Sequence, residues 1–554
     1  MPLDDSEWMP MILRVYFFIM KSNLNQEQQE CSQKILEFLE KKEFGYFGVY
    51  GAGGTGKTYM IANTVNDFNG KIIFLGATNK VVTVLKNSLE NANYLNPTCK
   101  TIDSFLKFKI EKDHENKSTI SYKFPSVSEI PDLIVIDEVS MLTNQKFQLI
   151  ERLKKHCKII LIGDYLQLPP IEEDKDNTVR NSDGFLVSKI FKSIPQDNTY
   201  TLTIQNRQKD GTQLSALVKG FRDNMHLKID PIKLAEKKNN RVDILYYFIN
   251  DKELKEIIKS SNCVSVCFKN LSVLNFNWLI GSTKSMRKDY RLNEINVGDS
   301  LMFDQFYTHQ KTSYYTSNIV EVLSIEKNVS ETFKIKEKMT KTITFNRLFI
   351  KDSDGESAEI RYIHGGLYGQ NGGGLSQSVY GQRKTYQEHI KQGKNVEENK
   401  KFLKDLNTRF ANYQNSFAKL KRPYAITAHK AQGSTYNAVI IPVYDYYTLN
   451  YKDANQLLYV ALSRAKEKVI FVNKKEQFDQ TSKRHSFSEF EKQSIASNYD
   501  YKCANCRTDL VDREFDCDHK LPISKGGKNS IENLQPLCKT CHKQKTAIDN
   551  QNKF

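Results

Sequence analysis

The chain has 554 residues, enough for three or four domains with sizeable buried cores. It carries 81 Lys and Arg against 65 Asp and Glu, a formal net charge of +16, and a basic excess of this kind favours a polyanionic partner. Ten cysteines, four of them in closely spaced pairs, exclude a disulfide scaffold, so we expect a reducing compartment: the cytoplasm or, for a viral protein, the host cytoplasm.

Residues 1–23 are predicted to be an N-terminal leader outside the folded domains. Their apolar stretch, residues 8–20, is interrupted by Pro10 and Arg14. It is too short to span a bilayer and has no small-residue cleavage site. Translation from Met20 in place of Met1 is the alternative, in which case the leader is not native.

A phosphate-binding loop is predicted at residues 51–58. Helical spacing over 24–43 precedes a strand over 46–50, and GAGGTGKT follows that strand directly. In the order strand, GxxxxGK[ST], helix, backbone N–H groups converge on phosphate at a helix N-terminus. Lys57 is expected to reach the β- and γ-phosphates, and Thr58 to offer its hydroxyl to Mg²⁺. The predicted nucleotide-binding residues of the loop are Gly51, Gly53, Gly54, Thr55, Gly56, Lys57 and Thr58.

Two further apolar strands are predicted to end in the acids and amide that ATP hydrolysis needs. The strand over 132–136 leads to Asp137, expected to hold Mg²⁺, and Glu138, expected to polarise the attacking water. The strand over 158–162 leads to Gln167, which is placed to sense the γ-phosphate. A buried acidic pair elsewhere is usually a satisfied salt-bridge partner, but its place downstream of a phosphate loop favours catalysis.

These motifs, with those at 77–80, 101–105, 202–208, 427–435 and 459–465, resemble superfamily 1 DNA helicases of the RecD/Dda type over residues 24–472. The resemblance implies an α/β fold of two RecA-like lobes, 24–203 and 204–475. The first lobe would carry a hairpin insertion at about 105–130 and the second an SH3-like insertion at about 290–420. In the second insertion we expect β-structure over 342–350, a glycine-rich loop over 365–374 and a Lys-rich helix over 395–421.

Alternating apolar residues over 106–124 predict the hairpin independently of the resemblance. Helicases of this type place a strand-separating pin there, and a plain connecting hairpin is the alternative.

The resemblance also assigns roles to single residues. Gln28 would read the adenine, Arg207 and Arg464 would be the two arginine fingers of the second lobe, and Gly433 would lie at the nucleotide. The residues expected to contact DNA are Thr78, Asn79, Thr101, Ser104 and His429. The chain departs from the usual pattern at Ala77, where Pro is common, and at Asp103, where His is common.

The tail contains two CxxC pairs, Cys503/Cys506 and Cys538/Cys541, with 31 residues between them. Paired knuckles in a reducing compartment predict a structural zinc ion held by four thiolates. Metal binding would supply much of the folding free energy of so small a domain, on the order of 10 kcal/mol.

The residues between and after these knuckles resemble the HNH endonuclease family. They include Gly526 and Gly527, Leu534 and Lys545. The resemblance implies that Asp518 and His542 hold one Mg²⁺ or Mn²⁺, that His519 is the general base, and that Asn533 braces the loop carrying this histidine. We expect a linker over 476–499 and a ββα-metal HNH domain over 500–554.

The sequence therefore predicts an ATP- and Mg²⁺-dependent DNA helicase or translocase, moving 5′ to 3′ on single strands, fused to a metal-dependent endonuclease. Two alternatives stay open: a helicase whose zinc domain only anchors DNA, and an ATP-gated DNA-binding switch without unwinding. The expected partners are single-stranded and forked DNA, with single-strand-binding, replication or recombination proteins as further candidates. We expect a monomer and no membrane association.

Overall fold

The structure, a computed structural model, describes residues 24–169, 178–180, 185–204, 212–229, 243–363, 374–473 and 502–551, together with 492, 495–496 and 499. Gaps within these ranges fall at 67, 95, 108, 113–117, 122, 193, 286–289, 293, 310–311, 354, 447–448, 509, 511–513 and 524–532. The predicted leader, most of the predicted linker, Arg207 and the pair Gly526–Gly527 therefore lie outside the described residues.

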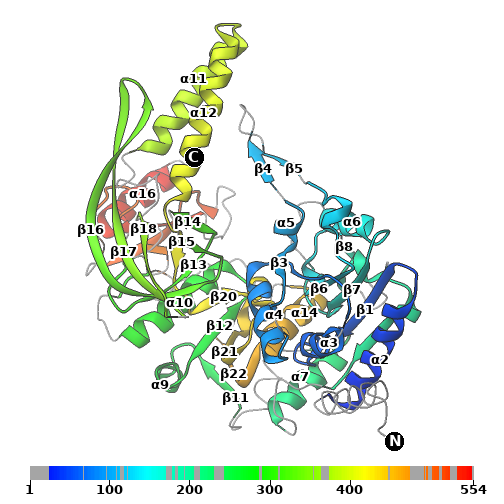
Figure 1. Cartoon of the computed structure of the whole chain (residues 1–554). Helices are drawn as coiled ribbons and strands as arrows, with labels where there is room; N and C mark the ends of the chain where they lie inside the picture. Colours follow the sequence, from blue (N-terminus) through cyan, green and yellow to red (C-terminus); the bar gives the residue numbers. More distant parts are fainter. Residues whose placement is uncertain are drawn as a thin grey trace, which may run out of the picture.

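Lobe 1 is built on a six-stranded parallel sheet (Figure 1). In spatial order its strands are β10 (Thr199–Leu202), β1 (Gly45–Gly51), β7 (Lys158–Gly163), β6 (Leu133–Asp137), β2 (Ile72–Gly76) and β3 (Cys99–Thr101). The inner strands are near-continuous apolar runs because helices and loops cover both faces, and two hydrophobic clusters fill the space on either side.

The helices of lobe 1 begin at side-chain caps, except the helix that follows the phosphate loop, which begins after Gly56. They are α2 (Gln26–Glu40), α3 (Lys57–Val65), α4 (Asn79–Asn91), α5 (Ile102–Phe105) and α6 (Asn144–Leu153). Helix α2 starts in a reciprocal capping box between Asn25 and Gln28. At its other end the buried ammonium of Lys158 donates to the carbonyls of Phe38, Leu39 and Lys41, which satisfies groups that a helix C-terminus leaves open.

Lobe 2 contains a second, five-stranded parallel sheet. Its strands in order are β11 (Ile244–Phe248), β22 (Ala465–Asn473), β21 (Tyr436–Pro442), β12 (Cys263–Cys267) and β20 (Ala425–Thr427). Its helices are α7 (Gln213–Asp223), α9 (Lys252–Ser260), α10 (Asn270–Ser285), α13 (Ala428–Ala431) and α14 (Tyr451–Ser463). Cys263 and Cys267 lie buried in β12, as expected for a core strand.

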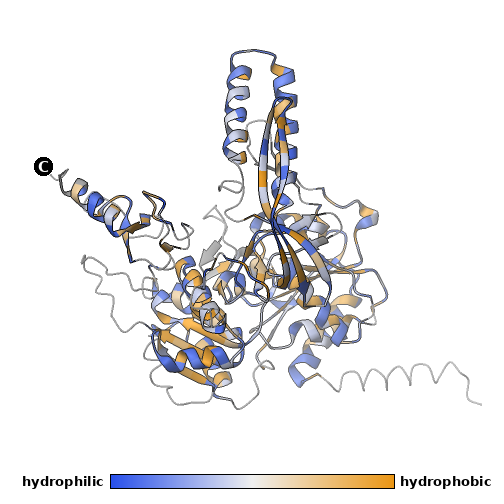
Figure 2. Ribbon diagram, turned by 90° about the vertical axis from the view of Figure 1, so that its left-hand side faces the viewer, coloured by the Kyte–Doolittle hydropathy of each residue, from blue (hydrophilic) through white to orange (hydrophobic). Residues whose placement is uncertain are grey.

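The insertion between α10 and β20 is a five-stranded antiparallel sheet with a protruding arm. The strands are β13 (Ser300–Phe303), β16 (Ile319–Lys336), β17 (Met339–Asp352), β18 (Ser357–Tyr362) and β19 (Leu420–Lys421), with the hairpin β14 (Tyr307–His309) and β15 (Thr312–Tyr314) beside them. The far ends of β16 and β17 pack against α11 (Leu375–Lys391) and α12 (Val396–Asn415) through one aromatic-rich cluster. Figure 2 shows this arm standing away from the two lobes.

The predicted hairpin of lobe 1 is present as β4 (Lys109–Lys112) paired antiparallel with β5 (Ser118–Ser121). It projects from lobe 1 in Figure 1, while its tip, 113–117, lies outside the described residues. A second short hairpin joins β8 (Thr178–Arg180) to β9 (Leu186–Ser188). Single 3₁₀ turns occupy Val127–Glu129, Val139–Met141, Lys189–Lys192, Gln196–Asn198 and Val443–Asp445.

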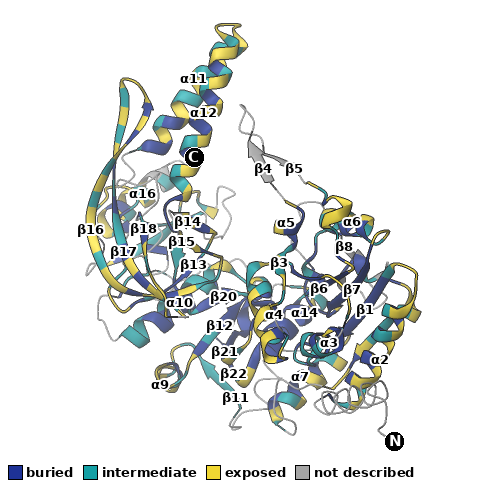
Figure 3. Ribbon diagram, in the orientation of Figure 1, coloured by how far each residue is buried: buried dark blue, intermediate teal, exposed yellow. Residues whose placement is uncertain are grey.

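The tail folds as a hairpin, β23 (Phe515–His519) with β24 (Leu534–Cys538), followed by α16 (Lys539–Gln551). Its core is small and includes two of the paired cysteines, Cys503 and Cys541. Figure 3 shows the contrast between the buried central strands of the lobes and the more exposed arm. No helix among the described residues is both long and apolar enough to cross a membrane.

Candidate functional site

The phosphate loop connects β1 to α3, as its sequence predicts. Gly51 has φ +154° and a Cβ there would lie 2.6 Å from the carbonyl oxygen of Leu202, so a side chain is excluded. The Lys57 Nζ donates to the carbonyl oxygens of Gly51 and Ala52, each at 2.9 Å. Burial lowers the pKa of Lys57, and the nearby carboxylates of Asp164, Glu138 and Asp137 oppose that shift. The ammonium thus lies folded onto the loop that is expected to hold phosphate.

Thr58 and Asp137, the two predicted magnesium ligands, lie in direct contact although 79 residues separate them. The Thr58 hydroxyl donates to Asp137 Oδ2 at 2.7 Å, and the Glu138 N–H donates to Asp137 Oδ1 at 2.8 Å. Desolvation raises the pKa of Asp137, so a cation at this position would favour the ionised carboxylate. A hydroxyl, a carboxylate and phosphate oxygens are the ligand set that Mg²⁺ prefers, so the residues fit the ion.

Glu138 has a left-handed backbone, with φ 52° and ψ 49°, which is uncommon for a residue other than glycine. Within the part of the chain that the structure describes, its Oε2 is buried and has no hydrogen-bond partner. Burial raises its pKa, with a further contribution from Asp137, while the positive charge of Arg464 lowers it. A buried acceptor with a spare lone pair suits a group that is expected to polarise a water molecule.

Gln28 contacts the phosphate loop from α2. Its Nε2 donates to the Thr55 carbonyl at 3.0 Å, and its Oε1 accepts from the Asn25 N–H at 3.1 Å. Both ends of this buried amide are therefore held. The predicted adenine-reading role remains a prediction, but the position beside the loop is compatible with it.

Lobe 2 supplies Arg464 to the same region. This residue is the C-cap of α14 and is buried, with Nη2 donating to Ser463 Oγ at 2.9 Å and Nε to the Val460 carbonyl at 3.2 Å. Its positive charge lowers the pKa of Glu138 of lobe 1, so the two groups interact electrostatically across the lobe boundary. Arg207, the other predicted arginine finger, lies outside the described residues.

Gly433 also lies at the lobe boundary. It has φ +71°, and a Cβ on it would lie 3.2 Å from Val81 Cγ2 of lobe 1. Lys80, next to Val81, extends from lobe 1 to lobe 2, where its Nζ donates to the Tyr436 hydroxyl at 3.3 Å. The segment 433–436 therefore packs directly on the start of α4.

The sequence gives no sign of a buried polar cluster that links the lobes and is centred on Asp164. Arg222 Nη1 of α7 donates to both carboxylate oxygens of Asp164, at 3.0 and 2.8 Å, and the Tyr459 hydroxyl of α14 donates to Oδ2 at 2.7 Å. Burial alone would raise the pKa of Asp164, but Arg222, Lys57 and Tyr459 hold it below its usual range. Only a sequence pattern that linked Asp164, Arg222 and Tyr459 could have predicted this cluster.

Gln167 lies three residues after Asp164, on the loop that lobe 2 holds. Its Oε1 is buried and has no partner among the described residues, whereas its main-chain carbonyl accepts from Gln456 Nε2 at 3.1 Å. The carbonyl of Leu168 accepts from Gln432 Nε2 at 2.9 Å. A buried side-chain acceptor left without a partner in the described part of the chain fits the predicted γ-phosphate sensor.

The residues predicted to contact DNA lie at or near the starts of α4, α5 and α13, each of which follows a strand. Thr78 caps α4 by accepting from the Val81 N–H at 3.3 Å, and Thr101 caps α5 by accepting from the Ser104 N–H at 3.1 Å. Asn79 is the first residue of α4. His429 lies in α13, and burial lowers its pKa. Their contacts with DNA stay predictions.

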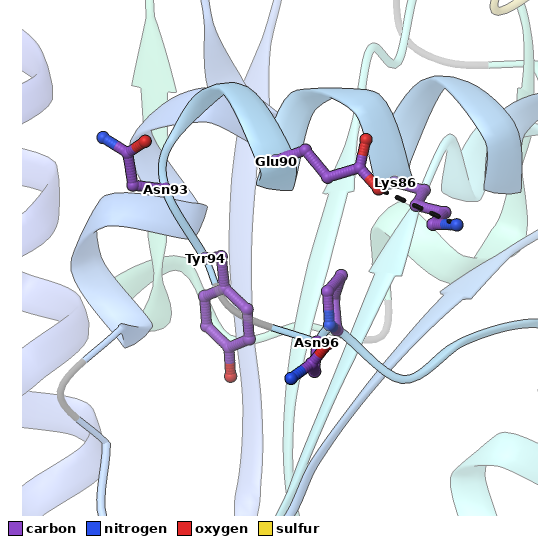
Figure 4. A pocket seen from close by; sticks show the side chains of 6 residues that line it. Lys86, Glu90, Asn93, Tyr94 and Asn96 are labelled. Carbon is purple, nitrogen blue, oxygen red and sulfur yellow. Dashed lines mark ion pairs between the residues drawn. The ribbon is translucent and has the colours of Figure 1, made fainter.

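A separate pocket of about 540 Å³ lies at the opposite end of α4 (Figure 4). It is lined by Lys86, Glu90, Asn93, Tyr94, Asn96 and Pro97. The loop before β3 lies at the amino edge of the parallel sheet, whereas the phosphate loop lies at the carboxyl edge. The pocket contains none of the predicted site residues.

The four tail cysteines converge. Their Sγ atoms all lie within 4.8 Å of one another, and Cys506 Sγ lies 3.7 Å from Cys538 Sγ. Tetrahedral zinc–thiolate bonds place sulfurs about 3.8 Å apart. Backbone N–H groups of Cys538 and Cys541 donate to Cys503 Sγ and Cys538 Sγ at 3.4 and 3.5 Å. The cluster therefore fits a tetrahedral metal ion.

The predicted nuclease residues surround the hairpin β23–β24 and α16. Asn533 clamps the chain just after His519, because its Oδ1 accepts from the Leu521 N–H at 2.9 Å and its Nδ2 donates to the Leu521 carbonyl at 2.8 Å. Asp518 Oδ2 lies 2.8 Å from Lys545 Nζ. The two predicted metal ligands, Asp518 and His542, thus come from β23 and from α16, which follows β24.

The structure adds one residue to this set, Asp516. Its Oδ2 lies 3.0 Å from His542 Nδ1, and its Oδ1 accepts from Lys539 Nζ at 2.9 Å. Burial raises the pKa of Asp516, but Lys539 and His542 together lower it below its ordinary value. A carboxylate on Nδ1 leaves Nε2 of the ring available to a metal ion. The period-two alternation that puts Asp516 and Asp518 on one face of β23 was the available signal.

Comparison with known proteins identifies three matching families. Residues 40–173 match the AAA domain, 423–472 the UvrD-like helicase C-terminal domain, and 503–547 the HNH endonuclease. An uncharacterized protein of Acanthamoeba polyphaga mimivirus is 26% identical over 509 residues, 81% of this chain and 99% of that protein. The ATP-dependent DNA helicase Pif1 of Campylobacter jejuni is 30% identical over 93 residues, 16% of this chain and 21% of that helicase.

Among solved structures, one that concerns DNA unwinding at forked double-stranded DNA by two coordinating Pif1 helicases is similar to this chain. It aligns with 16% sequence identity and a TM-score of 0.47, over 86% of this chain and 97% of that one.

Proposed function

We infer that this chain is an ATP-dependent DNA helicase of superfamily 1, of the Pif1 and Dda type, with a C-terminal HNH endonuclease domain. The observation that carries the motor part is the contact of Thr58 with Asp137 beside Glu138 in lobe 1, with the charge of Arg464 of lobe 2 acting on Glu138. Hydrolysis in such a site requires both lobes, so nucleotide binding can be converted into relative movement of the lobes.

The described residues support the following division of labour. Lys57 would leave the carbonyls of Gly51 and Ala52 for phosphate oxygens, while Thr58 and Asp137 would hold Mg²⁺, which supplies neutralising charge. Glu138 would orient a water molecule and accept its proton. Arg464 would approach the developing negative charge, an effect worth about 10³–10⁵ in turnover for such arginines.

We propose domain limits of 24–203, 204–475 and 500–554, because β10 ends at Leu202 and β22 at Asn473. We propose movement 5′ to 3′ along single-stranded DNA by a monomer, with forked DNA as the substrate that is unwound. The excess of Lys and Arg over Asp and Glu supports DNA binding, and the affinity for DNA should fall steeply as the salt concentration rises. ATP with Mg²⁺ in the motor, Zn²⁺ in the four-cysteine cluster and Mg²⁺ or Mn²⁺ in the nuclease are the proposed cofactors.

The nuclease proposal rests on the arrangement of β23 and α16. Asp518 and His542 would hold one divalent ion, and His519 would take a proton from the attacking water. Asn533 would keep the loop after His519 in place.

The motor proposal is tested by ATP hydrolysis with and without single-stranded DNA, and by strand displacement from duplexes carrying a 5′ or a 3′ tail. Lys57→Ala should abolish both activities. Hydrolysis without displacement on either tail would instead support an ATP-gated switch, and absence of DNA-stimulated hydrolysis in the parent would refute the motor proposal.

The nuclease proposal is tested by nicking of plasmid DNA with Mg²⁺ or Mn²⁺. His519→Ala should abolish nicking and leave ATP hydrolysis intact. If the parent binds DNA through its tail but does not nick it, the tail is an anchor only.

A further inference from the structure

The hairpin β14–β15 of the insertion has aromatic residues on both of its faces. Tyr307 pairs with Tyr314, and both rings are buried against Phe303, with centroids 5.7 and 4.7 Å from it. Phe306 directly precedes β14 and Tyr315 directly follows β15, and the alternation of side chains along an extended chain would place them on the opposite face. Alternation would ordinarily place polar residues on that solvent face.

Phe306 and Tyr315 instead form an exposed aromatic pair. They are 53% and 43% exposed, and their ring centroids lie 5.4 Å apart with planes inclined by 35°. Isolated exposed apolar residues are common on protein surfaces, but two adjacent rings offer one continuous aromatic surface.

The position of Tyr315 is fixed by a turn. Its N–H donates to Asn318 Oδ1 at 2.6 Å, its carbonyl accepts from the Asn318 N–H at 3.0 Å, and the Ser317 N–H donates to the Phe303 carbonyl at 2.8 Å. The aromatic surface is therefore ordered before any ligand arrives, which reduces the entropy lost on binding.

Lysines lie around Asp304, which is close to the pair in the chain. Asp304, two residues before Phe306, accepts from Lys421 and, at 2.8 Å, from Lys430, and its N–H donates to the carbonyl of the exposed Lys419. Two ammonium groups thus share one carboxylate, Lys419 is an exposed cation in the adjoining segment, and Lys430 keeps 46% of its side chain exposed. A net positive segment near two exposed aromatic rings is complementary to phosphates and bases.

We propose that Phe306 and Tyr315 form a stacking platform for an unpaired base of single-stranded DNA, with Lys419 and Lys430 facing the adjacent phosphates. This deepens the proposed function and depends on it. Every base presents a π-face, so the platform would hold a moving strand without sequence preference. In the view of Figure 1, β14 and β15 lie between the long strands β16 and β17 and lobe 1.

The test measures binding of a fluorescein-labelled oligothymidylate by anisotropy. Phe306→Ala and Tyr315→Ala should each weaken binding by about 5- to 150-fold, the range for loss of one stacked base. The dependence of binding on salt should keep its slope, because no phosphate contact is removed. Tyr380→Ala is the matched control, since that tyrosine is 68% exposed on α11 of the same insertion. Tyr315→Phe should bind as the parent does.

Direct stacking is tested with Phe306→Trp, whose indole emission should be quenched by the oligonucleotide and unaffected by a blunt duplex. Equal affinities for the two alanine variants, Tyr380→Ala and the parent would overturn the platform while leaving the helicase proposal standing. Failure of the parent itself to bind the oligonucleotide would overturn both. An unchanged melting temperature of the variants excludes misfolding as the cause of weaker binding.

Discussion

Arg222 of lobe 2 and Asp164 of lobe 1 form an ion pair across the lobe boundary, with Nη1 and Oδ2 2.8 Å apart and with 14% and 0% of their side chains exposed. Tyr459 completes the pair by donating to the same carboxylate oxygen. Because Asp164 directly follows β7, the strand that pairs with β1 before the phosphate loop, this contact ties the ATP site to both α7 and α14.

Removal of Arg222 should destabilise the protein strongly. Arg222→Gln leaves a buried carboxylate without its cation, and such a loss costs about 3–5 kcal/mol. Urea denaturation of parent and variant measures this loss of unfolding free energy. Lys259→Gln breaks an exposed pair with Glu256 and should cost at most about 1 kcal/mol. Equal losses of unfolding free energy for the two variants would show that the buried pair stabilises the protein no more than the exposed pair does.

The same pair should lose its effect only in acid. The folded-state pKa of Asp164 lies below its usual value, so the pair stabilises the fold fully above the unfolded pKa of about 3.9 and loses its effect as the pH falls through the lower, folded pKa. The parent should therefore keep this contribution unchanged from neutral pH down to about pH 4. In Arg222→Gln the arginine no longer opposes burial, which raises the pKa of Asp164. The variant should thus regain stability as the pH falls through that raised pKa, and the difference in unfolding free energy between parent and variant should shrink. A difference that stays constant from neutrality down to about pH 4 contradicts this assignment.

Arg464→Lys should lower the turnover of DNA-stimulated ATP hydrolysis by about 10³-fold or more, because lysine cannot reproduce the guanidinium geometry. KM for ATP should change far less, since the arginine is expected to act on charge that develops during hydrolysis. Steady-state kinetics separate the two parameters. A rise in KM with unchanged turnover would show that Arg464 only binds nucleotide.

Cys506→Ser should unfold the tail and spare the motor. The parent should contain one zinc ion per chain, and loss of one thiolate ligand should remove most of it, since structural zinc supplies about 10 kcal/mol or more in small domains. Metal analysis and limited proteolysis report the two effects. Cys517→Ser is the control, as Cys517 lies outside the four-sulfur cluster. Retention of zinc by the Cys506 variant would disprove the assigned ligand set.

Asp516→Asn should weaken Mn²⁺ binding to the tail by about 10- to 100-fold, the usual effect of removing a carboxylate that orients a ligating histidine. Calorimetric titration of Mn²⁺ measures this without reference to cleavage. His519→Ala should retain Mn²⁺ affinity and lose nicking. If Asp516→Asn binds Mn²⁺ as tightly as the parent, the contact with His542 is only structural.

Much of the two lobes could be predicted from local pattern. The strand expected over 46–50 spans Gly45–Gly51, and the one expected over 158–162 spans Lys158–Gly163. Short apolar runs followed by glycine or acidic residues suffice to place such strands. The helix expected over 24–43 is shorter, Gln26–Glu40, because Lys158 terminates it from a distant strand.

The insertion was less accessible to prediction. The expected β-structure over 342–350 is part of Met339–Asp352, but its partner β16, of 18 residues, was not foreseen. The middle of β16 is largely exposed and lacks regular alternation, so pairing with β17 rather than a buried face holds it. The expected helix over 395–421 stops at Asn415, after which the chain returns to pair with β13 as β19.

The residues alone specified the chemistry that is local in the chain: the phosphate loop, the acidic pair after an apolar strand, and the two CxxC knuckles. In each case, neighbouring residues have to act together, so their spacing carries the signal. The tertiary structure alone decided the partnerships between distant segments, such as Asp164 with Tyr459 across 295 residues and Phe306 with Tyr315 on a solvent-facing surface. Such contacts depend on how strands and helices pack, and no spacing rule in a single chain records that packing.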